Sequence, residues 1–317
     1  ITTELVTVPV RVIDRKNRFV GGMQKEDFKV FEDGVEQEIA YFTNESQPFT
    51  VALVLDMSYS STFKINDIQS AAIAFIDQLR PEDKVMVISF DEEVHMLTEA
   101  TSDRGQIYRA IRSTRIATGT SLYDAVDMTI NGRFRSIKGR KAMVLFTDGV
   151  DTTSRISHDL KNLQDAMELD ALIYPIRYDT FSDVQAMKNK TTVITFPQPQ
   201  PPTGQRSPIP GGIPVPATPS DKGTTAAEYA HGEEYLNRLA DNTGGRIYLA
   251  TTVGNLNGAF SKIASELREF YSIGYEPKGV AIPGRTRRIK VRTDRKEVAI
   301  KARDTYVVPK KKESRSK

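Results

Sequence analysis

The sequence contains no cysteine among its 317 residues. This absence excludes disulfides, thiol nucleophiles, thiolate zinc sites and iron–sulfur clusters. Histidine is scarce as well: His95, His158 and His231 lie far apart in the sequence, and none belongs to an HExxH-like pair. A histidine-based metal site would therefore require the fold to bring them together.

Long apolar runs and a strongly basic body are also missing. No run of about eighteen apolar residues occurs, so the sequence predicts no membrane-spanning segment. The net formal charge is +3, but the last eight residues carry five bases and one acid, which leaves the rest at about −1. A nucleic-acid-binding protein would need a basic body, so no nucleic-acid partner is expected. The start at Ile1, without a methionine or an apolar signal core, is expected of a mature or trimmed chain.

Hydrophobic residues make up 39% of the chain, enough for a buried core, and their patterning is β-like near both ends. Valine at every second position of 5–13 indicates a half-buried strand. Two further strands, 28–32 and 35–42, meet across Asp33-Gly34, a strong hairpin signal. Strands near the other end are predicted at 271–275, 287–292 and 298–302. We expect the terminal strands to share one small antiparallel β domain.

The middle of the chain has a different pattern. Apolar runs without alternation, typical of parallel strands buried on both faces, occur at 51–55, 85–90, 142–146, 172–176 and 247–249. Amphipathic helices are predicted at 65–79, 104–115, 122–133, 159–169, 233–240 and 256–270. Because strand and helix alternate, the sequence predicts a doubly wound, mostly parallel α/β sheet of the Rossmann-like kind, inserted between the terminal β segments.

One segment, 197–219, contains nine of the sixteen prolines. Proline has no backbone donor, so this segment cannot join the interior of a sheet or helix. It is predicted to be an extended insertion in the α/β domain. Two interpretations stay open: a solvated loop, or a docking tract for an aromatic groove on another protein.

Oxygen-bearing side chains gather where predicted elements end or begin. Asp56, Ser58 and Ser60 come at the end of the first buried strand, Thr120 lies in a loop that enters a helix, and Asp148 follows another buried strand. Because the carboxyl ends of parallel strands meet at one edge of a sheet, where open α/β folds place ligands, we expect these side chains to converge. Hydroxyl and carboxylate oxygens suit a hard divalent cation, Mg²⁺ or Mn²⁺.

This pattern, DxSxS followed by a threonine and an aspartate, resembles the metal-ion-dependent adhesion site (MIDAS) of von Willebrand factor type A (VWA) domains. The resemblance implies that Ser58 and Ser60 are direct ligands and that Thr120 is a conditional one. It also implies that Asp56 and Asp148 act mainly through water. A partner protein would present an Asp or Glu whose carboxylate completes the coordination of the ion.

The flanking segments are similar to those of a bacterial VWFA-related family. A Val-Phe-Glu-Asp-Gly hairpin precedes the domain, and Tyr-x-Ile-Gly-Tyr follows it, at 30–34 and 271–275. The predicted domains are an N-terminal β segment (1–47), a VWA domain (48–270), a C-terminal β segment that pairs with the first (271–309) and a basic disordered tail (310–317). The family resemblance also implies a periplasmic, secreted or cell-surface location in bacteria. Many members have glycine where this chain has Tyr59, a larger residue that would narrow the approach to the ion.

Motifs of enzymes with comparable folds are absent from the sequence. A haloacid-dehalogenase-type phosphatase needs a second acid two residues after the first aspartate, where this chain has Ser58. The patterns GxxxxGK[ST], GxGxxG and GxSxG do not occur. We therefore expect a non-enzymatic, cation-dependent protein-binding module. A metal-independent scaffold of an envelope assembly and a metal-dependent hydrolase are the alternatives.

The segment 285–303 is a second candidate site because it holds nine bases against two acids. It could contact a polyanion or an acidic surface. Arg288, Lys290 and Arg292, however, alternate with Ile289 and Val291. This alternation favours the solvated face of a strand, where such charges also prevent unwanted strand pairing.

Overall fold

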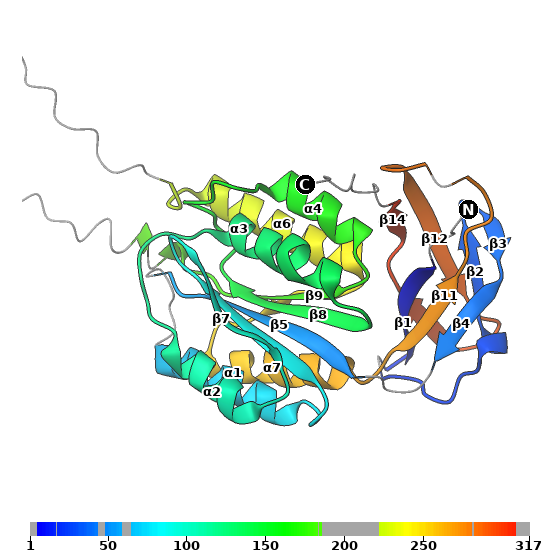
Figure 1. Cartoon of the computed structure of the whole chain (residues 1–317), viewed down its shortest axis with the longest axis horizontal. Helices are drawn as coiled ribbons and strands as arrows, with labels where there is room; N and C mark the ends of the chain where they lie inside the picture. Colours follow the sequence, from blue (N-terminus) through cyan, green and yellow to red (C-terminus); the bar gives the residue numbers. More distant parts are fainter. Residues whose placement is uncertain are drawn as a thin grey trace, which may run out of the picture.

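The structure is a computed structural model that describes residues 5–16, 18–43, 48–58, 65–182, 184–185, 222–280 and 282–308. In this part of the chain, an α/β unit lies beside a β unit (Figure 1). The predicted fold class, a doubly wound sheet with a small antiparallel β domain from both chain ends, is confirmed. The described helices include none that is long and apolar enough to cross a membrane. The insertion 197–219 and the tail 310–317 lie outside the described residues, and the predicted domain boundaries stay predictions.

The α/β unit is built around a six-stranded sheet in the order β10-β9-β8-β5-β6-β7. Its strands are β5 (Phe49–Asp56), β6 (Lys84–Phe90), β7 (Val94–Thr101), β8 (Arg140–Thr147), β9 (Leu172–Arg177) and β10 (Tyr248–Leu249). Neighbours pair in parallel except β7, which was not predicted and runs antiparallel to β6. Every residue of β5 is buried, because helices cover both faces of the sheet.

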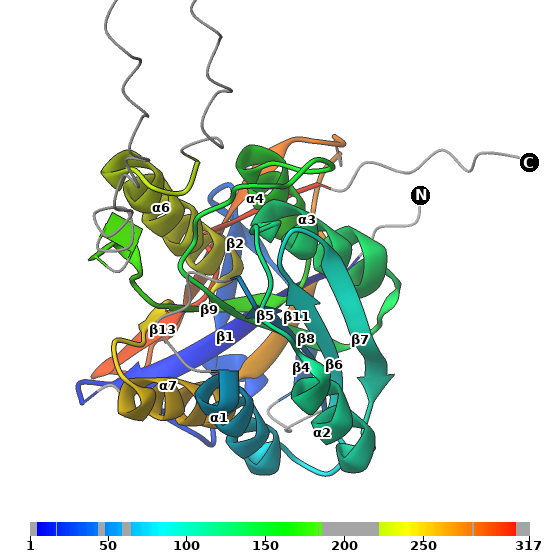
Figure 2. The ribbon, with the colours of Figure 1, turned by 90° about the vertical axis from the view of Figure 1, so that its left-hand side faces the viewer.

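Helices pack on the two faces as separate layers (Figures 1 and 2). One layer is formed by α1 (Ile65–Gln78), α2 (Arg104–Ser113) and α7 (Val253–Glu266). The other is formed by α3 (Leu122–Asp127), α4 (Asp159–Glu168) and α6 (Ala226–Thr243). After α3 the chain continues as a π-helical turn, η2 (Met128–Arg133), and a 3-10 turn, η3 (Phe134–Ser136). The predicted helices are therefore all present.

Helix α6 is longer than its predicted range of 233–240. It begins with a capping box, in which the Thr225 hydroxyl accepts a hydrogen bond from the Glu228 amide and the Glu228 carboxylate accepts one from the Thr225 amide. It ends at Gly244, whose φ of +79° suits the left-handed C-terminal cap. The first turns contain mostly small and polar residues, so apolar periodicity alone could not reveal them.

The β unit consists of two antiparallel sheets, in the orders β13-β1-β11-β4 and β14-β12-β2-β3. The first sheet contains β1 (Val6–Asp14), β4 (Ile39–Thr43), β11 (Tyr271–Tyr275) and β13 (Val298–Lys301). The second contains β2 (Lys29–Glu32), β3 (Val35–Gln37), β12 (Thr286–Arg292) and β14 (Thr305–Val307), and a short 3-10 turn, η1 (Lys25–Asp27), precedes β2. Strand β1 pairs with both β11 and β13, so strands from the two ends of the chain share a sheet.

This arrangement corrects two predictions. We expect one small sheet, but the structure has two, and their shared core includes Val10, Tyr271 and Ile289. We also expect a single strand over 35–42, but it divides at Glu38, where β3 in one sheet gives way to β4 in the other. The chain therefore changes sheets inside what the apolar pattern presents as one strand. The short strand β14 was not predicted either.

Two arginines of the β unit connect it to both helix layers. Arg11 in β1 donates to the carboxylates of Glu266 and Glu269 at the end of α7, at 3.3 and 2.7 Å. Arg303, only 5% exposed, donates to the carbonyl oxygens of Leu169, after α4, and Thr7, in β1, at 3.1 and 2.8 Å. Because both guanidinium groups are buried, these contacts fix the β unit against the α/β unit.

Candidate metal centre

The predicted ligands lie at the edge of the sheet that faces the viewer in Figure 2. From β5 the chain continues to β6 on one side, and it later returns to β8 on the other side. Strand order thus reverses between β5 and β8, and such a switch point opens a crevice at the carboxyl ends of the strands. Asp56 is the last residue of β5, and Asp148 directly follows β8.

Asp56 is completely buried at this switch point. One of its oxygens, Oδ1, accepts a hydrogen bond from the Ser58 amide at 2.9 Å. The other, Oδ2, accepts one from the Thr147 hydroxyl at 2.7 Å. Burial and the nearby charge of Asp148 raise the pKa of Asp56, while the hydrogen bonds from Ser58 and Thr147 act in the opposite direction.

Asp148 is 2% exposed and is held in a similar way. Its Oδ1 accepts a hydrogen bond from the Val150 amide at 2.9 Å, and its Oδ2 accepts one from the Thr180 hydroxyl at 2.7 Å. The Thr180 hydroxyl also shares a 2.7 Å hydrogen bond with the phenol of Tyr229 in α6. Burial raises the pKa of Asp148 as well. Both carboxylates are therefore oriented by donors that carry no charge.

The two hydroxyl residues lie on loops tied to these strand ends. Ser58, 2% exposed, forms a parallel bridge with Ala117, whose amide donates to the Met57 carbonyl oxygen at 3.0 Å. Thr120, 5% exposed, donates through its amide to the Thr152 hydroxyl at 2.9 Å, and its carbonyl oxygen accepts from the Thr152 amide at 2.9 Å. Backbone contacts thus connect the loops that follow β5, precede α3 and follow β8.

Four of the five predicted ligands therefore belong to one connected set of loops. Asp56, Ser58, Thr120 and Asp148 are brought together, whereas Ser60 lies outside the described residues. The donor set fits a hard divalent cation, because it offers carboxylate and hydroxyl oxygens and two buried negative charges. Neither carboxylate forms an ion pair with a Lys or Arg in the described ranges, so no protein cation there neutralises them directly.

Sequence reasoning missed the two threonines that hold the carboxylates. Thr147 is the last residue of β8, and Thr180 follows the end of β9. Thr147 stands at the carboxyl end of a strand that borders the switch point, and Thr180 follows the strand beside it; this strand-end position is the signal that could have identified them.

The fold also brings two histidines to one carboxylate. His231 Nε2 lies 3.1 Å from Asp159 Oδ2, and His158 Nδ1 lies 3.8 Å from Asp159 Oδ1. His158 caps α4 by accepting a hydrogen bond from the Lys161 amide at 3.3 Å. Across the described ranges, no group of three or more His, Asp or Glu side chains has the geometry of a metal site.

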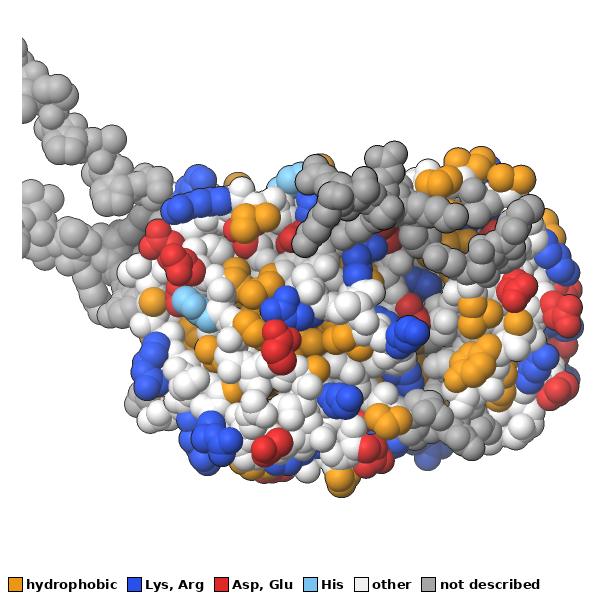
Figure 3. Space-filling model, viewed as in Figure 1, with side chains coloured by type: hydrophobic (Ala, Val, Ile, Leu, Met, Phe, Trp, Pro, Cys, Tyr) orange, Lys and Arg blue, Asp and Glu red, His pale blue; other side chains and the backbone are white. Residues whose placement is uncertain are grey.

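The basic segment 285–303 does not form one patch. Arg288, Lys290 and Arg292 point outward from β12, as the alternation predicts. Arg287, by contrast, forms a 2.8 Å ion pair with Asp33, and Arg303 is buried. Figure 3 shows acidic and basic side chains interspersed on one face of the molecule. The solvated-strand interpretation therefore describes this segment better than a polyanion site.

A doubly wound sheet with carboxylates and hydroxyls at its switch point defines a class of ligand-binding α/β domains. Residues 51–150 match the family model of the von Willebrand factor type A domain. This segment runs from β5 to the loop after β8 and includes the four described candidate ligands. That part of the α/β unit therefore resembles a VWA domain. No curated protein sequence matches the chain.

Solved structures with a related fold are only distantly similar. BatB from Bacteroides thetaiotaomicron is 17% identical, with 69% of this chain and 98% of that chain covered and a TM-score of 0.45. A von Willebrand factor type A protein from Catenulispora acidiphila is 10% identical, with 98% and 74% covered and a TM-score of 0.48. Proximal thread matrix protein 1 from the mussel byssus, solved with zinc in its MIDAS motif, is 12% identical, with 75% and 50% covered and a TM-score of 0.49.

Proposed function

We propose that this protein is a non-enzymatic, divalent-cation-dependent protein-binding module. One observation carries the proposal: two buried carboxylates, Asp56 and Asp148, share an edge of the sheet with the hydroxyl residues Ser58 and Thr120. Two buried negative charges without a directly paired cation are costly unless a positive ion accompanies them. A bound Mg²⁺ or Mn²⁺ would supply that charge.

The candidate residues have different proposed roles because their side chains differ in charge. Ser58 and Thr120 would offer neutral hydroxyl oxygens to the ion, together with Ser60 by family resemblance. Each carboxylate oxygen of Asp56 and Asp148 already accepts one hydrogen bond and keeps a second lone pair, which suits an indirect role in orienting bound water. When bound, a cation with neutral ligands keeps positive charge that attracts an outside carboxylate. The partner is therefore a protein that presents an Asp or Glu.

The proposed setting is the bacterial envelope, either the periplasm or the cell surface. This part of the proposal rests on the VWA match and on the family resemblance of the flanking hairpin and the Tyr-x-Ile-Gly-Tyr strand.

Calorimetry with Mg²⁺ and Mn²⁺ tests the cation. Wild-type protein should bind one ion, and Ser58→Ala and Thr120→Val should each weaken binding by about 10–100-fold, the usual loss when the supports of a metal site are removed. Ser265→Ala is the matched control, because the hydroxyl of this exposed serine in α7 donates to the nearby Glu269 side chain, far from the site. Equal affinity in all four proteins would contradict the assigned site.

A peptide array tests the partner. Peptides with one Asp or Glu should bind in Mg²⁺, while matched Asn or Gln peptides should not. Binding should disappear in EDTA and in Ser58→Ala. Peptides that bind equally in EDTA and to the variant would contradict the proposal and support the metal-independent scaffold.

A further inference from the structure

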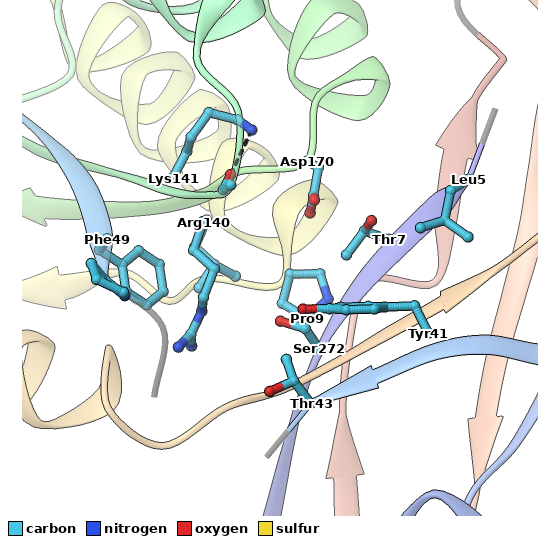
Figure 4. A pocket seen from close by; sticks show the side chains of 13 residues that line it. Leu5, Thr7, Pro9, Tyr41, Thr43, Phe49, Arg140, Lys141, Asp170 and Ser272 are labelled. Carbon is cyan, nitrogen blue, oxygen red and sulfur yellow. Dashed lines mark hydrogen bonds between the residues drawn. The ribbon is translucent and has the colours of Figure 1, made fainter. Parts of the chain in front are cut away.

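A cavity of about 370 Å³ lies between the α/β unit and the β unit (Figure 4). Its walls come from the first residues of β5, β8 and β9 and from β1, β4 and β11. It therefore lies at the amino edge of the six-stranded sheet, opposite the candidate metal centre. Because a parallel strand rises roughly 3.3 Å per residue, the length of β5 separates the two places by about 20 Å.

A buried lysine lines this cavity. Lys141 is only 8% exposed, and its Nζ donates a 2.9 Å hydrogen bond to the Gly139 carbonyl oxygen. That bond uses one of the three donors of an ammonium group. In the described ranges Lys141 has no ion pair, and burial lowers its pKa. A buried ammonium with donors to spare is costly unless an acceptor enters the cavity.

Arg140 and Asp170 complete the charged part of the wall. The Arg140 guanidinium lies 4.1 Å from the centre of the Phe49 ring, and burial lowers the pKa of Arg140 to about 10. Asp170 accepts no hydrogen bond and forms no ion pair within the described part of the chain. Figure 4 shows Asp170 facing Thr7 of the β unit, whereas the Arg140 side chain points away from Lys141. Two cations against one carboxylate leave the wall with a net charge of about +1, which matches a monoanion better than a phosphate dianion.

The remaining wall combines hydroxyl and apolar groups. Thr7, Thr43 and Ser272 contribute hydroxyls, and Pro9, Tyr41 and Phe49 contribute apolar surface. A volume of this size, lined by apolar groups with a few polar ones, is typical of small-molecule sites. We propose that the cavity binds a small organic carboxylate, with its charge at Lys141 and its apolar part against Tyr41 and Phe49. This site is independent of the proposed metal centre.

Three probes with the same ring and different charge test the ligand class. Benzoate, benzyl alcohol and benzylamine should be titrated against the full chain by calorimetry and thermal shift, in EDTA so that the metal centre plays no part. Benzoate should bind saturably and raise the melting temperature, whereas the alcohol should bind roughly tenfold more weakly and the amine not at all. No saturable benzoate binding, or equal binding of benzoate and the alcohol, would overturn the proposal.

Variants locate the site. Lys141→Met removes the charge at similar length and should weaken benzoate binding roughly tenfold or more, and Lys141→Arg should restore part of it. Lys290→Met is the matched control, because this lysine is exposed on β12. Tyr41→Ala is a second test variant, and it should also weaken benzoate binding. Because Tyr41 is 43% exposed, this substitution does not disturb a buried side chain. Unchanged affinity in both Lys141→Met and Tyr41→Ala would place benzoate elsewhere and refute the assignment.

Discussion

Gly232, inside α6, lies directly against Gly149, the residue after Asp148. A Cβ on Gly149 would come within 3.0 Å of the Gly232 carbonyl group, and a Cβ on Gly232 would collide with the Gly149 carbonyl. Gly149 also has a φ of +91°, which favours glycine. The helix and the Asp148 loop therefore meet through a close backbone contact at this point.

Gly232→Ala should push α6 away from that loop. We expect a loss of about 1–3 kcal/mol in the free energy of unfolding, as for other overpacked positions, and weaker Mg²⁺ binding. Gly258→Ala in α7 is the matched control, since no atom lies within 4 Å of the position that its new methyl group would take; it should gain up to about 1 kcal/mol from helix propensity. Urea unfolding measures the stability of both variants, and calorimetry measures their Mg²⁺ binding. If Gly232→Ala behaves like Gly258→Ala, α6 does not support the site.

The variant Asp148→Asn should show separately how the buried charge lowers the stability of the metal-free protein and how it contributes to Mg²⁺ binding. The Asn oxygen can still accept from the Val150 amide, and its NH₂ group can donate to Thr180, whose hydroxyl can then donate to Tyr229. Without the repulsion between Asp56 and Asp148, the metal-free protein should become more stable. One pKa unit corresponds to about 1.4 kcal/mol, and we expect a gain of this order.

Thermal melts in EDTA and in Mg²⁺ measure this effect. Asp148→Asn should melt at a higher temperature than wild type in EDTA and should lose most of the stabilisation by Mg²⁺. Ser58→Ala should lose the Mg²⁺ stabilisation without the gain in EDTA. A lower melting temperature of Asp148→Asn in EDTA would contradict charge repulsion at the site.

Arg11→Met should weaken the junction between the two units. Arg11 is 7% exposed and contacts Glu266 and Glu269. Removing one partner of a buried ion pair costs about 3–5 kcal/mol in unfavourable cases. We expect less, about 1–3 kcal/mol, because Glu266 retains Arg246 and the Tyr248 phenol, at 3.3 and 2.7 Å.

Chemical unfolding of two further variants checks the origin of this loss. Adding Glu266→Gln to Arg11→Met should recover part of it, because the uncompensated charge is then removed. Arg238→Met breaks an exposed ion pair with Glu234 and should change stability by less than about 1 kcal/mol. Equal losses in Arg11→Met and Arg238→Met would mean that burial does not strengthen the junction.

Ending the chain after Pro277 should expose the β unit. The truncation removes β12, which pairs with β2, and β13, which pairs with β1. Unpaired strand edges and the uncovered apolar side chains of the shared core should then cause aggregation. Size-exclusion chromatography and near-ultraviolet circular dichroism measure the result. A soluble, monomeric truncation with a native spectrum would show that the terminal strands do not depend on each other.

The sequence predicts the α/β unit well because burial on both faces gives its strands continuous apolar runs. Strand β7 has no such continuous apolar run and was therefore not predicted. It lies at the edge of the sheet, and His95, Thr98 and Glu99 interrupt its apolar residues. Only its pairing with β6 makes it a strand, and such long-range contacts leave no local pattern.

The β unit is harder to predict for a related reason. Gln37 and Ile39 are both buried, at 4% and 6% exposed, as one continuous strand would have them. They nevertheless belong to different sheets, and alternation cannot show on which side of Glu38 the partner changes. At the candidate metal centre, residue type and strand-end position predict which residues the proposed ligands are. The threonines that orient the carboxylates become visible only when β8 and β9 are placed side by side.

The chain crosses between its two units twice, from β4 to β5 and from α7 to β11, and both crossings lie at the amino edge of the sheet. A pull exerted at the opposite edge, where a partner would dock, therefore reaches β4 and β11 together. Strand β11 lies between β4 and β1 and shares five residue pairs with β1. Hydrogen bonds in such a ladder run perpendicular to the strands. A force along the strands would load these bonds simultaneously, in shear, and not one after another.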